Sequence, residues 1–234
     1  MLCRMGCDGY AVRLGLREYR DVEQLQKLLV AKRLEGSLPD TLILAEHPPV
    51  ITMGRGGGAE NLLLPEKELK RRGIEVLTCS RGGNITYHGP GQLVLYPILD
   101  LANHVKDVHW YLRSLEQVII NILGYFGIRA ERNTGHTGVW VHRRKIASIG
   151  IAVNRWVTYH GLALNVSLDL TPFGYVVPCG LKQFGVTSMT AVLERGPQME
   201  QVVKEAIFQM GEQFELDLRE VTLEALTDLC QKAR

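Results

Sequence analysis

Cys179 is the residue whose type and surroundings most directly suggest covalent chemistry. It lies between Pro178 and Gly180, which predicts a tight, exposed loop, whereas structural cysteines more often lie within apolar segments. The pKa of a free cysteine thiol is about 8.5, and a nearby cation lowers it to roughly 3.5–7.5. The candidates for that cation are Lys145, His88 and His160. Spacing along the chain does not choose among them, so the residues alone predict a cysteine enzyme and no more.

The other four cysteines suggest no second reactive site. Cys79 ends an apolar segment and Cys230 lies in a helical tail, so both are interpreted as packing residues. Cys3 and Cys7 have a C-x₃-C spacing, but no second Cys/His pair with metal-ligand spacing lies nearby. We therefore expect no metal site.

A glycine-rich stretch over residues 81–92 is the second candidate for a functional segment. Its four glycines allow the backbone to approach a ligand closely or to adopt a positive φ, although an ordinary connection would have the same composition. Neither of the nucleotide-binding fingerprints G-x-G-x-x-G and G-x-x-x-x-G-K-[ST] can be read in it. The earlier run 54–58 fails the same test and is interpreted as a flexible turn rather than a phosphate cradle.

Lys145 and the His160-Gly161 step lie in segments with strand character. Alternation places Lys145 on the same strand face as Ala147 and Ile149. The pattern alone favours a lysine that extends to solvent from a strand end over one placed beside a pocket. A glycine inside a strand indicates a bulge or a close backbone approach, which is expected at Gly161.

The predicted elements that must position these residues are helices and strands without regular alternation. Helices are expected over 18–34, after Pro65, from an N-cap at Asp107 to Gly127, and over 198–215 and 222–231. Strands are expected over 41–45, 74–79, 93–99, 137–142, 146–153, 156–160 and 162–166, with hairpin turns at 142–144 and 154–155. The buried face of the long helix is predicted to comprise Tyr111, Leu115, Val118, Ile119, Ile122 and Phe126.

Length, composition and charge bound the class of protein. The chain has 234 residues, of which 46% are hydrophobic, and 27 basic against 25 acidic residues give a formal charge of +2. This balance gives no electrostatic reason to expect nucleic-acid binding. No apolar run approaches the roughly 18 residues of a membrane span, and no secretory signal is expected. We expect one α+β domain over residues 1–234, or one with a small C-terminal subdomain, in a reduced, cytoplasmic protein.

The ordered motifs resemble those of the octanoyltransferases (lipoate–protein ligase B). The similarity covers about residues 10–215, and residues 1–9 are left as an extra segment of unknown role. The matching blocks are Arg81-Gly82-Gly83 with Thr86-Tyr87-His88, Gly91-Gln92 and Tyr96, then residues 137–140, 144–150, 160–165, 178–180 and 186–188.

The resemblance implies a fold, an activity and partners. The fold is α+β, with mixed β-sheets flanked by helices as in the biotin/lipoate protein ligases. The activity is transfer of an octanoyl group from octanoyl-acyl carrier protein to a lysine of the lipoyl domains of 2-oxoacid dehydrogenase complexes and of the glycine cleavage H protein. No cofactor is implied, and we expect a monomer with neither nucleic acid nor membrane as partner.

The resemblance also assigns site residues. Cys179 matches the nucleophile and Lys145 the lysine that lowers the pKa of its thiol, against the solvent-directed orientation that the pattern favoured. The segments that match the acyl-substrate lining contain Arg81, Gly82, Gly83, Asn84, Ile85, Thr86, Tyr87 and His88, then Ser148, Ile149 and Gly150, then Gly161, Leu162 and Ala163. Two rival functions are an ATP-dependent ligase of the same fold and a catalytically silent acyl-binding protein.

Overall fold

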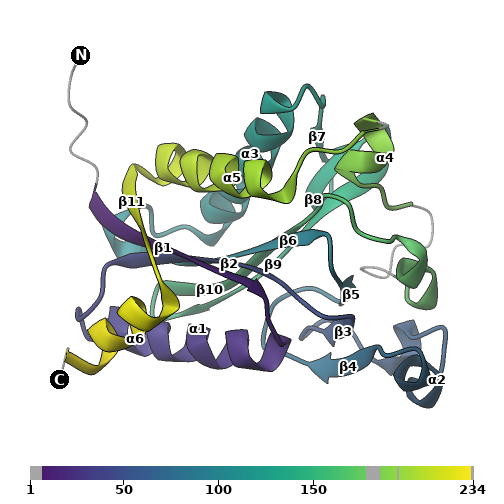
Figure 1. Cartoon of the computed structure of the whole chain (residues 1–234), viewed down its shortest axis with the longest axis horizontal. Helices are drawn as coiled ribbons and strands as arrows, with labels where there is room; N and C mark the ends of the chain where they lie inside the picture. The colour runs from purple at the N-terminus through teal and green to yellow at the C-terminus, as the bar shows by residue number, and fades with distance from the viewer. Residues whose placement is uncertain (1–6, 178–184, 194, 233–234) are drawn as a thin grey trace.

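Two β-sheets form the framework of the computed structural model, which describes residues 7–177, 185–193 and 195–232 (Figure 1). In these residues the large sheet has eight strands in the order β11-β1-β2-β6-β10-β9-β8-β7, and the small sheet has three in the order β4-β3-β5. The strands of the large sheet are β1 (Cys7–Leu16), β2 (Asp40–Glu46), β6 (Gln92–Ile98), β7 (Glu131–Asn133), β8 (His136–Val141), β9 (Arg144–Asn154), β10 (Val157–Asn165) and β11 (Leu216–Val221). Those of the small sheet are β3 (Val50–Met53), β4 (Glu75–Thr78) and β5 (Ile85–His88).

Helices cover both faces of the large sheet (Figure 1). Helices α3 (Val108–Tyr125) and α5 (Met199–Phe214) lie on one face, and α1 (Tyr19–Leu34) and α6 (Leu223–Lys232) on the other. The short helices are α2 (Glu66–Arg71) and α4 (Met189–Leu193), with 3₁₀ turns η1 (Ala59–Asn61), η2 (Leu101–Asn103) and η3 (Thr171–Tyr175). The large sheet contains both parallel and antiparallel pairs, so the predicted α+β class with mixed sheets and flanking helices is confirmed.

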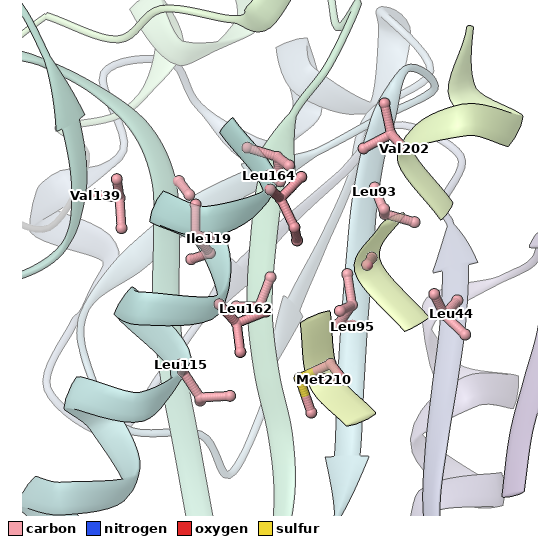
Figure 2. Close-up of a cluster of buried hydrophobic side chains, with 14 of the residues drawn as sticks. Leu44, Leu93, Leu95, Leu115, Ile119, Val139, Leu162, Leu164, Val202 and Met210 are labelled. Atoms are coloured by element: carbon pink, nitrogen blue, oxygen red, sulfur yellow. The ribbon is translucent and has the colours of Figure 1, made fainter. Parts of the chain in front are cut away.

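Alternation along the central strands builds one core on each face. In β6, Leu93 and Leu95 face α3 and α5, whereas Val94 and Tyr96 face α1. Figure 2 shows side chains from the sheet converging with those from the two helices on the first face. Because both faces are buried, β6 reads as a nearly continuous apolar run rather than an alternating one.

The start of α3 follows the predicted capping. The carboxylate of Asp107 accepts hydrogen bonds from the backbone N–H groups of His109 and Trp110 at 2.7 and 3.1 Å. The predicted buried face is confirmed except at Phe126, which is half-buried and lies just beyond the helix. Glu116 was not expected in this face, yet it is fully buried.

The hairpin around β9 and β10 combines a confirmed and a wrong prediction. Both turns use two residues with positive φ, His142 and Arg143 before β9 and Arg155 and Trp156 after it, which suits the twist of antiparallel strands. The predicted strands 156–160 and 162–166 are one continuous strand, β10. His160 stays in that strand with a φ of 55°.

Strands β1, β3, β5, β7 and β11 were not predicted. Strand β5 lies inside the glycine-rich stretch, and residues 7–9 of the segment set apart as residues 1–9 belong to β1. Within the described residues, no helix is both long and apolar enough to cross a bilayer.

Candidate active site

The site forms where β9 loses its neighbour in the large sheet. Strand β8 pairs with β9 only as far as Ala147, and among the described residues no other strand pairs with the later part of β9 on that side. Residues 81–84 cross this open edge, and the backbone N–H of Gly82 donates to the carbonyl oxygen of Ile151 at 2.7 Å. A methyl group added to Gly150 would lie 2.9 Å from the carbonyl oxygen of Gly82, so the close approach requires glycine there. The loop and the strand edge thus enclose a cleft.

The inner part of this cleft, here called the inner cavity, lies on the α1 side of the sheet. It has a volume of about 50 Å³. Twelve of the predicted lining residues border it: Arg81, Gly83, Asn84, Ile85, Thr86, His88, Ser148, Ile149, Gly150, Gly161, Leu162 and Ala163. The other lining residues are Tyr19, Val94, Tyr96 and His160. Sequence reasoning missed Tyr19 and Val94. Alternation along the apolar run 93–99 could have indicated Val94, because the even-numbered residues of that run lie on the cavity-facing side of the strand.

The outer groove continues the cleft on the α3 side of the sheet. Its volume is about 420 Å³, and its lining residues are Gly56, Gly82, Gly83, Asn84, Leu112, Gly135, His136, Thr137, Lys145, Ile149, Gly150 and Ile151. Gly83, Asn84, Ile149 and Gly150 line both spaces. The edge of β9 and residues 83–84 therefore form a shared wall between the inner cavity and the outer groove, which lie on opposite faces of the sheet.

Lys145 lies in the outer groove and not at the solvent. Its side chain is only 6% exposed, and Nζ lies 5.5 Å from the centre of the Trp140 ring. This burial excludes the solvent-directed orientation that the strand pattern had favoured. Lys145 shares the groove with Ile149 and Ile151, as the alternation predicts.

Two predicted site residues are placed elsewhere. Gly82 lines the outer groove only, and Tyr87 lines neither space. Alternation in β5 turns the Tyr87 side chain away from the cavity, and its ring lies edge-on to that of Phe173 at 5.7 Å. Burial raises the pKa of Tyr87 to about 12.

Cys179 lies outside the described residues, but the chain on both sides of its segment is anchored. The N–H of Val177 donates to the carbonyl oxygen of Asn61 at 2.9 Å. After the gap, the carbonyl oxygen of Gly185 accepts the N–H of Lys145 at 2.9 Å. The chain that leads away from Cys179 thus returns directly to Lys145.

Burial decides among the three candidate cations. It lowers the pKa of His88 and of His160 to about 3, so both imidazoles are neutral at neutral pH. His47, which contacts the same cluster, has its pKa lowered to about 4, again by burial. This excludes both histidines as the cation and leaves Lys145 as the remaining candidate.

A directed chain of hydrogen bonds runs from the inner cavity toward Lys145. Arg81 donates to the hydroxyl oxygen of Thr52 at 2.9 Å, and this hydroxyl donates to Nε2 of His88 at 3.2 Å. Nδ1 of His88 donates to Oε1 of Gln92 at 2.7 Å. Because Oε1 of Gln92 can only accept, Nδ1 of the neutral His88 ring carries the proton and Nε2 accepts from Thr52.

The second half of the chain ends on the backbone of β9. Nε2 of Gln92 donates to Oδ1 of Asn165 at 2.8 Å, and Nδ2 of Asn165 donates to the carbonyl oxygen of Thr187 at 2.9 Å. The N–H of Thr187 then donates to the carbonyl oxygen of Lys145 at 2.9 Å. Because these side chains are buried, each hydrogen bond also satisfies a polar group that would otherwise be costly.

His160 and Gly161 explain the irregular step in β10. The positive φ of His160 turns its ring toward the α1 face, where Nε2 lies 2.9 Å from the hydroxyl of Ser80 and Nδ1 lies 3.5 Å from that of Tyr19. A methyl group added to Gly161 would collide with the carbonyl oxygen of Leu95. The close backbone approach that the sequence predicted is confirmed.

The run 54–58 supports the glycine-rich loop at residues 81–84. The N–H groups of Gly54 and Gly56 donate to the carbonyl oxygens of Asn84 and Gly83 at 3.1 and 2.9 Å. The N–H of Arg55 donates to the carbonyl oxygen of Arg81 at 3.0 Å. The run contains a turn at residues 55–56, as predicted, and these N–H donors bind carbonyl oxygens within the protein.

The remaining cysteines fit their predicted packing roles where the structure describes them. Cys79 and Cys230 are free and buried, and burial raises the pKa of Cys230. In the described ranges no group of three His, Cys, Asp or Glu side chains is placed to hold a metal ion.

Solved structures with this fold are lipoate and biotin protein ligases. The bi-partite lipoate protein ligase of Thermoplasma acidophilum superposes with a TM-score of 0.74 at 19% identity, covering 97% of this chain and 91% of its own. The biotin protein ligase of Aquifex aeolicus superposes with a TM-score of 0.55 at 11% identity, covering 89% of this chain and 70% of its own. The fold class expected from the motifs is confirmed.

Sequence relatives resolve the family. The profile of the lipoyl protein ligase A/B catalytic domain matches residues 18–211, and the chain belongs to that family. It is 50% identical to the octanoyltransferase of Solibacter usitatus over 86% of this chain and 87% of that protein. It is 48% identical to the octanoyltransferase of Geobacter metallireducens over 78% of this chain and 82% of that protein. Within its family the chain is an acyltransferase of the octanoyltransferase group.

Proposed function

We propose that this enzyme moves an octanoyl group from octanoyl-acyl carrier protein to a lysine of a lipoyl domain, through a thioester on Cys179. The acceptors would be the lipoyl domains of 2-oxoacid dehydrogenase complexes and the glycine cleavage H protein, and the transfer would be the first step of protein lipoylation. The observation that carries this proposal is the placement of Lys145. It is a buried amine in the cleft whose backbone binds the chain six residues after Cys179.

The first half-reaction exchanges one thioester for another. The Cys179 thiolate attacks the acyl carbonyl, a new C–S bond forms, and the carrier leaves as a thiol after taking up a proton. Thioester exchange is nearly thermoneutral, so no ATP is needed. A cationic Lys145 would stabilise the thiolate, which lowers the pKa of Cys179.

The second half-reaction forms the amide. The acceptor lysine attacks as a neutral amine, the C–N bond forms, and the bond to the Cys179 sulfur breaks. One proton of the attacking amine must leave, and Lys145 in its neutral form can accept it. The octanoyl chain would extend from the outer groove around the edge of β9 into the inner cavity, whose lining includes Ile85, Val94 and Leu162.

Intact mass measurement after incubation with octanoyl-acyl carrier protein tests the covalent step. Wild type should gain one octanoyl group that neutral hydroxylamine removes, and Cys179→Ala should gain none. The matched controls Cys79→Ala and Cys230→Ala should be labelled like wild type, because both thiols are buried packing residues. Octanoylation of Cys179→Ala at the wild-type level would refute the nucleophile, and ATP–pyrophosphate exchange without labelling would identify an adenylating ligase instead.

A further inference from the structure

Glu116 is a buried carboxylate outside the cleft lining. It is 0% exposed on α3, although the predicted buried face of this helix did not include it. Its Oε2 accepts hydrogen bonds from Arg113 Nη1 at 2.7 Å and from Arg132 Nε at 3.1 Å. A buried carboxylate is costly unless it is paired, and two arginines satisfy only one of its oxygens.

The other oxygen of Glu116 binds the backbone of β8. Its Oε1 accepts the N–H of Gly138 at 3.0 Å. Gly138 has a φ of 128°, which favours glycine because other residues are strained there. The carboxylate therefore joins α3 to an irregular point of β8, beside the bulge at which the register between β8 and β9 shifts.

Gly138 also contacts the far end of Lys145. A methyl group added to Gly138 would lie 2.6 Å from Cε and 3.2 Å from Nζ of Lys145, and 2.7 Å from the carbonyl oxygen of Ala147. The Lys145 side chain thus lies on bare backbone at Gly138, with the Trp140 ring next along the same strand.

We propose that Glu116 is a positioning residue for Lys145, acting through Gly138. Holding the Gly138 N–H fixes the backbone surface on which Cε and Nζ of Lys145 lie, and the two arginines hold the carboxylate. Any effect on catalysis rests on the proposed function of Lys145, whereas the positioning itself can be measured without the reaction.

Trace labelling with acetic anhydride measures the position of the Lys145 amine directly. The labelled fraction of Lys145 is quantified by peptide mass spectrometry relative to exposed Lys67 in the same sample. Glu116→Ala removes the acceptor and Gly138→Ala adds the obstructing methyl group. Both variants should raise the relative labelling of Lys145 at least threefold, because its amine would no longer be held in its buried position. Glu116→Gln keeps an oxygen for the Gly138 N–H and should stay within twofold of wild type.

Glu205→Gln is the matched control, because Glu205 is a buried carboxylate of α5 that binds Gln209 and not β8. Gly138→Ala retains Glu116 and both of its arginine partners, so it remains informative if Glu116→Ala fails to fold by circular dichroism. Unchanged labelling in the folded alanine variants would overturn the positioning role. Raised labelling with wild-type transfer would support that role and instead refute the catalytic role of Lys145.

Discussion

Thr187 donates its backbone N–H to the carbonyl oxygen of Lys145 at 2.9 Å, and its own carbonyl oxygen accepts the side-chain amide of Asn165. Lys145 is therefore held at its backbone by the segment that follows Cys179 and at its side chain by Gly138 and Trp140. Two independent parts of the chain fix the same amine. We therefore expect the position of Lys145 to be sensitive to changes in buried residues outside the cleft lining.

Substitution of Lys145 should separate its two proposed roles. Lys145→Arg keeps a positive charge and should retain part of the thiolate character of Cys179, but guanidinium cannot accept a proton. Transfer to the lipoyl domain should then fall by roughly 10²–10⁴-fold, the usual contribution of general acid–base catalysis. Lys145→Ala should also slow iodoacetamide alkylation of Cys179 at pH 7. Single-turnover transfer and the pH profile of alkylation measure the two effects. Wild-type transfer by the arginine variant would eliminate the role as a base.

Replacement of Asn165 should disrupt the hydrogen-bond chain between Gln92 and Thr187. Asn165→Leu leaves the Thr187 carbonyl without this donor, and a buried polar group without a partner costs about 1–3 kcal/mol. We expect a loss of this size in the free energy of unfolding from urea titration, with a further loss of turnover at saturating substrate. Asn121→Leu is the control, since Asn121 binds Gln117 on half-buried α3 surface. Equal stability of Asn165→Leu and wild type would contradict the chain.

Acid should destabilise the fold through its buried histidines. The pKa of His47 is lowered to about 4, against about 6.5 for an unfolded chain. Between these values the unfolded state binds the extra proton, so stability is complete above about pH 6.5 and falls as the pH is lowered toward 4. His88 and His160 add to this loss, with folded pKa values of about 3.

Protonation should lower the free energy of unfolding at pH 5 by about 2 kcal/mol for each of these three histidines. This pH lies about 1.5 units below the unfolded pKa, and one pKa unit corresponds to about 1.4 kcal/mol. Urea titrations at pH 7.5, 6.5 and 5 measure the slope. His47→Gln should reduce it by close to one proton, whereas His109→Gln, a change at an exposed histidine, should not. The same slope in His47→Gln and wild type would show that His47 is not a source of the acid sensitivity.

Two glycines should respond oppositely to alanine. Gly161→Ala places a methyl group against the carbonyl oxygen of Leu95 and 2.8 Å from Cδ of Pro97, which are parts of a central strand that cannot move cheaply. We expect a loss of several kcal/mol or failure to fold, in the range of overpacked cores. Gly124 lies in α3 with nothing within 4 Å of the added methyl, so Gly124→Ala should stabilise the helix by about 1 kcal/mol. Similar thermal midpoints for the two variants would show that the strands adjust freely.

The local patterns of the sequence predicted the elements that bury a regular face. The N-cap at Asp107 and the periodicity of α3 depend only on neighbours within one turn, so both were readable. The cleft lining followed from family motifs, because its segments come from strands distant in sequence. Tyr19 and Glu116 were missed since each looks like an ordinary helix residue until the fold brings it to the inner cavity or to Gly138. The orientation of Tyr87 required knowing that β5 exists.

The pairing of β1 with β11 has a consequence for how the chain folds during synthesis. Gly9 pairs with Leu218, so this edge of β1 has no such partner until about 200 further residues have been made. At about 5–20 residues per second, translation leaves this strand edge open for roughly 10–40 s. An open edge of this kind invites pairing with other chains. The strand that finally covers it exposes Asp217, Arg219 and Glu220, charges that discourage further pairing once the sheet is complete.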